Sequence, residues 1–308
     1  MPIQAAGFFL CAVFFCANAL SQPLQNESGA YRITLEDISK TISRGEQPGL
    51  KVDIYEAEKK KVESKWSKAI RKETKSKVAN VNNEISIHGT LLKQISLKPL
   101  NVYSIINQYD DHIELNAFFE SENSFLTKEK HETEYLAARK FLRDFAVEAY
   151  REVVQMQIKT EEKKLSSLER ELDDLVKEND KLHKKINEEK RSIDNAKEKI
   201  VTSELDQERV KKQVQEQKMQ VSQIISNHSS KEVVKEAEKK LKNWEAEVAK
   251  LEKQEDSLHR DINKSEAAIR EAERGISANG QAMQLKQNEI TRQKQVVYNY
   301  QKKWESIK

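Results

Sequence analysis

The six histidines are the first residues to consider for chemistry, because imidazole is both a common metal ligand and a common general base. They lie at positions 88, 112, 131, 183, 228 and 259, and none has the His-x-His, His-Glu-x-x-His or cysteine-paired spacing typical of zinc sites. Asp110-Asp111-His112 is the one cluster that resembles a metal or acid–base group, but acidic residues at a hairpin tip are ordinary turn formers. We therefore expect no metal site and interpret the cluster as a turn.

The sequence also lacks the motifs typical of nucleophilic catalysis and of nucleotide binding. It contains no Gly-rich phosphate loop and no Gly-x-Ser-x-Gly elbow. Both cysteines, Cys11 and Cys16, lie in the N-terminal apolar run described next, so a processed chain has no thiol nucleophile. We predict that the protein is not an enzyme, with no catalytic residue and no cofactor.

The apolar run Ala5 to Leu20 ends in Ala17-Asn18-Ala19, a small-x-small pattern of the kind that signal peptidase cuts. We predict that residues 1–19 are a signal peptide and that the protein is exported, to the periplasm of a bacterial envelope. The alternative is an uncleaved signal that anchors the chain in the inner membrane, although this run is shorter than the roughly 20 residues that a membrane span needs.

The composition points to a long, solvated, helical protein. Of the 308 residues, 34% are charged and only 37% are hydrophobic, which is too polar for one large globular core. The 54 basic and 51 acidic residues nearly cancel, which argues against nucleic-acid binding and against an acidic disordered tail. All four prolines lie in the first third of the chain, and beyond Pro99 the only glycines are Gly275 and Gly280.

The residue pattern in the first half of the chain predicts a polar leader followed by a small α+β domain. We assign residues 20–48 to the leader, with at most one short element around Tyr31 to Ile42, and residues 49–150 to the domain. The expected elements of that domain are a strand at 50–55, a helix through Val62, Trp66 and Ile70, alternating runs at 84–88 and 92–97 around a turn at Gly89, a hairpin of 102–106 with 112–119, and a helix from near His131.

The predicted helix around Trp66 carries a basic face. Glu56 to Lys77 has nine Lys or Arg against four Glu, and the candidate contacts for an anionic lipid, wall polymer or acidic partner are Lys59, Lys60, Lys61, Lys65, Lys68, Arg71 and Lys72. The alternative is an ordinary solvated helix face.

At these residues a resemblance appears. Residues 58–66 (EKKKVESKW), 98–103 (KPLNVY) and 135–146 (YLAARKFLRDFA) resemble an uncharacterised family of exported bacterial proteins. The resemblance implies a small α+β domain joined to a C-terminal coiled coil, and it implies no established activity.

The second half of the chain has sustained heptad spacing. Alternating steps of three and four residues run from Leu165 to Ile224, and a second series out of phase with the first runs from Val234 to Ile307, with mostly apolar residues at both. Between them lies Asn227-His228-Ser229-Ser230, where Ser229 and Glu232 have capping-box spacing. We predict a coiled-coil hairpin over 151–308 with its turn near 227–231.

If the helices fold back at residue 229, the numbers of facing residues should sum to about 458. This register sets Asn179 against Asn279 and Ser203 against Glu255, and it places Val297, Tyr300, Trp304 and Ile307 where they can dock on the domain or the root of the first helix. A polar layer of this kind lowers stability and fixes register. Two alternatives are a break at Gly275 to Gly280, which would give three helices, and a parallel dimer of long helices.

The predicted fold class is therefore mainly α, with a small α+β N-terminal domain followed by a long antiparallel coiled-coil helical hairpin. We expect a noncatalytic structural or interaction protein of the bacterial envelope, a monomer or small homo-oligomer that uses the hairpin as a spacer or as a binding arm for protein partners. The alternative is a periplasmic holdase chaperone with helical arms, similar to proteins of the Skp type. An enzyme in the small domain is the third hypothesis.

Overall fold

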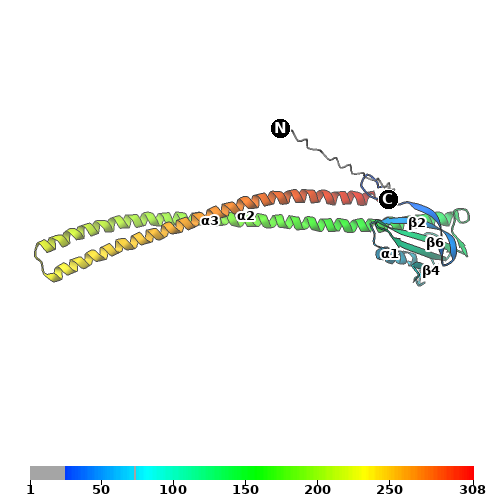
Figure 1. The fold of residues 1–308 in the computed structure, drawn as a ribbon, viewed down its shortest axis with the longest axis horizontal. Helices are drawn as coiled ribbons and strands as arrows, with labels where there is room; N and C mark the ends of the chain where they lie inside the picture. Colours follow the sequence, from blue (N-terminus) through cyan, green and yellow to red (C-terminus); the bar gives the residue numbers. More distant parts are fainter. Residues whose placement is uncertain (1–24, 73) are drawn as a thin grey trace, which may run out of the picture. The chain divides into compact units, whose positions relative to one another are not determined.

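The structure is a computed structural model that describes residues 25–72 and 74–308. The predicted signal peptide, residues 1–19, lies outside the described residues, and so do both cysteines. The described chain is mainly helical, with an N-terminal antiparallel sheet and two long helices that pack together (Figure 1). It divides into two compact units. The sheet domain comprises the described residues up to Lys163 together with Lys294–Lys308, and the two-helix segment comprises Lys164–Gln293.

The sheet domain is built on one antiparallel sheet. Its strands are β1 (Leu35–Ile42), β2 (Gly45–Tyr55), β3 (Ala79–Val81), β4 (Glu84–Thr90), β5 (Leu100–Gln108), β6 (His112–Ser121) and β7 (Ser124–Phe125). They lie side by side in the order β1-β2-β6-β5-β4-β3, and β7 pairs with the end of β6. The predicted hairpin of 102–106 with 112–119 is thus confirmed as β5 and β6, with Tyr109 to Asp111 between them.

Helices cover one face of this sheet because alternate residues of each strand are apolar on that side. Helix α1 (Lys59–Arg71) and the first turns of α2 (Glu132–Ser226) supply Trp66, Leu142 and Tyr150 to a core that includes Ile54 and Leu115. All five side chains are fully buried. The indole Nε1 of Trp66 donates a hydrogen bond of 2.7 Å to Ser104 Oγ, so its polar atom is satisfied within the core.

The last turns of α3 (Lys231–Ser306) belong to the same domain. Ile307, just beyond the helix, is 1% exposed in the core, and the Arg151 guanidinium donates to its carbonyl oxygen at 2.7 Å. That guanidinium also lies over the Trp304 ring, 5.2 Å from its centroid. The predicted docking of Trp304 and Ile307 is therefore confirmed, and the domain, assembled from two stretches distant in sequence, extends beyond the predicted bounds 49–150.

Three details of the sheet domain differ from the sequence-based expectations. Strand β1 occurs where one short element was expected, around Tyr31 to Ile42, but it belongs to the sheet and not to a polar leader, and β2 also begins within 20–48. Residues 92–97 form a turn rather than a strand, and the side chains of Leu92 and Ile95 in this turn are buried in the core. Gly89 does not end its strand: its φ of 66° produces a bulge in β4, after which Thr90 pairs with Leu100.

The two long helices lie side by side in the two-helix segment (Figure 1). Ion pairs join Lys211 to Glu252 at 3.4 Å and Lys218 to Glu245 at 3.1 Å. Residues later in α2 therefore pair with residues earlier in α3, so the two helices run antiparallel. Helix α3 continues through Gly275 and Gly280, contrary to the three-helix alternative. A Cβ at residue 275 would lie 2.9 Å from Leu182 Cδ1, so glycine there permits close packing of the helices.

Candidate functional site

The polar residues predicted to set the coiled-coil register, Asn179, Asn279, Ser203 and Glu255, are buried or half-buried. Glu255 accepts a 2.6 Å hydrogen bond from Gln207 Nε2 rather than from Ser203. Ser203 Oγ is buried without a hydrogen-bond partner, and so is Asn179 Oδ1. Asn279 is half-buried. Gln207, one turn after Ser203 on α2, therefore supplies the side-chain donor to Glu255.

The four predicted turn residues lie between α2 and α3. His228 has a φ of 53°, and it ends α2 with two crossed bonds: its own N–H donates to Ile225 O and the N–H of Ser229 donates to Ile224 O. This is a Schellman motif with histidine where glycine is usual. The N–H of Val234 donates to Ser230 O, so α3 begins one residue later than the capping box at Ser229 predicted.

The basic residues of α1 are spread around the helix and are partly paired with acids. Lys65 lies 2.6 Å from Glu152 and 3.2 Å from Glu148, both on α2. Lys61 pairs with Glu58, and Lys59 pairs with Glu63. Lys60, Lys68, Arg71 and Lys72 form no ion pair with any described residue, and they leave the helix with a net basic surface.

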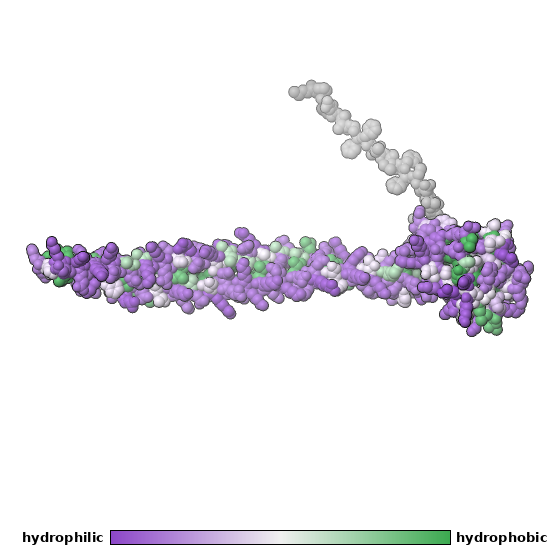
Figure 2. Space-filling view, turned by 90° about the horizontal axis from the view of Figure 1, so that it is seen from below, coloured by the Kyte–Doolittle hydropathy of each residue, from purple (hydrophilic) through white to green (hydrophobic). Residues whose placement is uncertain are grey.

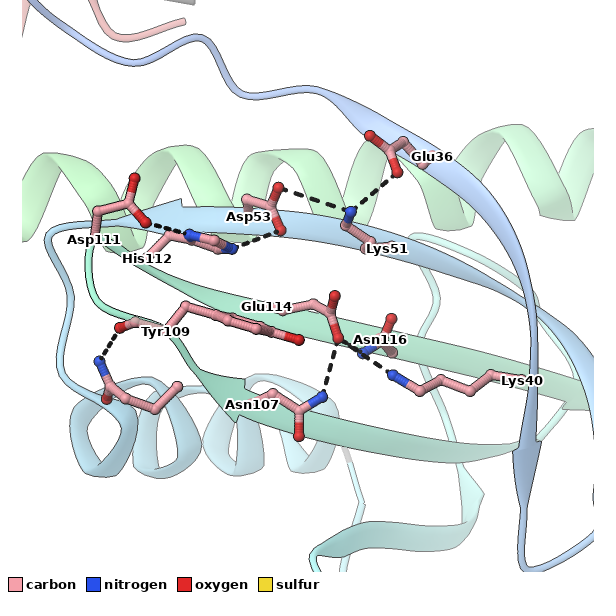
Figure 3. A network of polar contacts seen from close by, with 11 residues as sticks. Glu36, Lys40, Lys51, Asp53, Asn107, Tyr109, Asp111, His112, Glu114 and Asn116 are labelled. Carbon is pink, nitrogen blue, oxygen red and sulfur yellow. Dashed lines mark hydrogen bonds and ion pairs between the residues drawn. The ribbon is translucent and has the colours of Figure 1, made fainter. Parts of the chain in front are cut away.

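Asp111 and His112, from the cluster singled out in the sequence, join a larger polar network on the sheet face opposite the helices (Figure 3). His112 Nδ1 donates to Asp111 Oδ1 at 2.7 Å, and its Nε2 lies 3.7 Å from Asp53 Oδ1. Burial raises the pKa of Asp53, and Lys51, 4.0 Å away, opposes that shift.

Two further carboxylates on this face are held ionised by hydrogen bonds. Burial alone would raise the pKa of Glu114, but donors from Asn116, Asn107 and Lys40 lower it below its usual value. Burial acts in the same way on Glu120, and donors from Asn101, Arg44 and Tyr103 again lower its pKa. Tyr103, buried beside the Glu120 carboxylate, has its pKa raised to about 12. These groups are satisfied by their neighbours, so they stabilise the sheet.

The sequence could not reveal the Asp53 contact because Asp53 and His112 come together only through the pairing of β2 with β6, in which Tyr55 faces His112. Among the described residues, no group of three or more His, Cys, Asp or Glu side chains is arranged to hold a metal ion. In the same part of the chain, no helix is long and apolar enough to span a membrane.

The two-helix segment exposes apolar side chains outside its interface. Val201 is 56% exposed and Leu205 64% exposed, one turn apart on α2, and Leu285 on α3 is 65% exposed. All three fall at outer heptad positions, where coiled coils usually carry polar residues. Figure 2 shows such apolar patches within the mainly polar surface of the helices.

Comparison of the sequence and structure with protein-family models, with curated proteins and with solved structures finds no match.

Proposed function

We propose that the protein is a noncatalytic interaction protein of the bacterial envelope, and that α2 and α3 of one chain form an antiparallel coiled-coil hairpin that serves as its binding arm. The exposed pair Val201 and Leu205 carries this proposal. Apolar side chains at outer heptad positions contribute nothing to pairing between α2 and α3, so they are available to a partner.

The hairpin is supported by the short connection and by the contacts across the interface. Only residues 227–230 separate the helices, and His228 reverses the chain direction with a left-handed backbone. Two ion pairs join the helices, Lys211 with Glu252 and Lys218 with Glu245. In each pair the two residue numbers add up to 463, close to the sum of about 458 predicted for a chain that folds back on itself.

Cysteine cross-linking tests the hairpin. In a chain with Cys11 and Cys16 changed to Ser, the double variant Lys218→Cys, Glu245→Cys should oxidise to a disulfide within one chain. The single variant Lys218→Cys is the matched control, because a parallel dimer would place two copies of residue 218 side by side and link them. Dimer bands from the single variant would reject the hairpin.

Site-specific photo-cross-linking in cells tests the binding arm. A photoreactive residue at position 205 should form adducts with a partner, whereas one at Lys212, one heptad later on the same outer face, should not. Equal labelling at both positions, or none, would mean that the helices act only as a spacer.

The holdase chaperone is the second candidate, because exposed apolar side chains on helical arms could also hold unfolded clients. Suppression of aggregation of an unfolded outer-membrane protein should then require Val201 and Leu205. Loss of suppression in the variant Val201→Glu, Leu205→Glu would favour the holdase over a dedicated partner.

A further inference from the structure

Three hollows adjoin one another along α2 in the sheet domain. They have volumes of about 410, 530 and 280 Å³. The first and second share Lys65 and Lys68, and the second and third share Val153 and Met156. Together they follow α2 from residue 141 to residue 161, which is roughly 30 Å at ~1.5 Å per residue. We call these three adjoining hollows the α1–α2 groove.

The floor of the groove is apolar. Helix α2 contributes Phe141, Phe145, Ala149, Val153 and Met156, spaced by three or four residues so that they form one stripe. Met156 is 46% exposed and Val153 is half-buried, so part of this apolar surface faces solvent.

The two rims of the groove carry opposite charge. On α1, Lys61, Lys65, Lys68 and Lys72 recur at spacings of three or four residues, and on α2, Asp144, Glu148 and Glu152 recur every four. Lys65 bridges the rims through its ion pairs with Glu148 and Glu152. Among the described residues, Lys68 and Lys72 have no ion-pair partner, so they remain available to a ligand.

We propose that the α1–α2 groove binds an amphipathic helix of a partner protein, with an apolar stripe on the floor, acidic residues along the edge facing α1 and basic residues along the edge facing α2. The length of the groove fits about 20 residues of helix at ~1.5 Å per residue. A flat anionic membrane would meet the acidic rim as well as the basic one, which disfavours that occupant. This site lies in the sheet domain, and it is independent of the binding arm proposed above.

Designed peptides can test this charge pattern with the full-length protein. Three labelled peptides of about 20 residues would share one leucine stripe. The first has Glu on one flank and Lys on the other, the second has Glu on both flanks, and the third has Lys on both. Fluorescence anisotropy should show the mixed peptide binding about tenfold more tightly than either of the others, because several weak surface ion pairs form along both flanks at once. Equal affinity of the three peptides would overturn the proposal.

Two variants sharpen the test. Lys68→Glu with Lys72→Glu reverses two of the four charges on the basic rim, and it should shift the preference toward the peptide with Lys on both flanks. Met156→Lys should weaken all binding by covering the floor with charge, whereas Leu97→Lys, at an 85% exposed position outside the groove, should have no effect. Unchanged preference in the first variant, or equal effects of the last two, would show that the groove is not the binding site. Circular dichroism confirms that each variant is folded.

Discussion

The ion pair between Lys303 and Glu56 fixes the end of α3 in the sheet domain, and we predict the effect of removing it. The Lys303 ammonium lies 2.5 Å from the Glu56 carboxylate and within 6.0 Å of the ring centroids of Tyr31, Tyr150 and Tyr300. The side chain is only 13% exposed. Lys303→Met keeps the aliphatic stem and removes the charge, so it isolates the electrostatic part of this contact.

The magnitude follows from the partial burial of the pair. An exposed ion pair contributes ~0.2–1 kcal/mol, whereas removal of one partner from a fully buried pair costs ~3–5 kcal/mol. Glu56 is 24% exposed and keeps a 2.9 Å hydrogen bond from Gln157 Nε2, which limits the loss. The three rings lie near the outer limit of cation–π attraction and add less than ~1 kcal/mol each. We expect Lys303→Met to cost about 2 kcal/mol.

Amide hydrogen exchange of the last turns of α3 measures this loss locally. A cost of about 2 kcal/mol corresponds to exchange that is roughly thirtyfold faster. The matched control is Lys302→Met, because the neighbouring lysine pairs with the exposed Glu305 and should change nothing measurable. In a double-mutant cycle, Glu56→Gln should remove most of the effect of Lys303→Met. Equal exchange in the two lysine variants, or additive effects in the cycle, would refute the reasoning.

Three other predictions concern single positions. His228→Gly should raise the unfolding free energy of the two-helix segment by about 1 kcal/mol in urea denaturation, because glycine adopts the left-handed backbone of a Schellman motif without steric strain; no gain would mean that the histidine is unstrained. Asn179→Leu should also stabilise the segment, by ~1 kcal/mol, because it removes a buried amide oxygen that has no hydrogen-bond partner; a loss of stability would show that this oxygen is hydrated. The pKa of Glu120 is lower in the folded protein than its ordinary value, so its stabilising effect is complete above that value and is lost as the pH falls through the folded pKa. The stability advantage of the native chain over Glu120→Gln should therefore shrink on acidification below about pH 4.5, and a constant difference between the two unfolding curves would contradict this assignment.

Local periodicity was enough to predict the long helices, because each turn repeats the same apolar spacing and few glycines or prolines interrupt it. The spacing of Leu182, Ile186 and Ile193 on α2 is an example, and the last two of these side chains are buried. The hairpin of β5 and β6 was also predictable, since its strands alternate clearly and its turn is short.

Features that depend on pairing between distant residues could not be predicted in this way. The short element expected around Tyr31 to Ile42 was not assigned to the sheet, because β1 lies at the sheet edge and its polar residues Glu36, Asp37 and Lys40 obscure the alternation expected of a strand. The contact of Asp53 with His112 depends on strand order, which no local pattern encodes. Local spacing likewise gives no sign that the basic row on α1 lies opposite an acidic row on α2.

The composite nature of the sheet domain affects the order in which the protein can fold during synthesis. Its core needs Ile307, yet the 130 residues of Lys164–Gln293 are made between that residue and the rest of the domain. At a translation rate of ~5–20 residues per second, synthesis from Lys163 to Ile307 takes roughly 7 to 29 s, and the sheet lacks its last apolar side chains during that time. Until then, the surface that Ile307 and Trp304 will cover stays open to proteases and chaperones. A chain whose synthesis stalls within the helices would lack Ile307 and Trp304, and its core would stay exposed. The sheet domain can therefore be complete only after both helices have been synthesised in full.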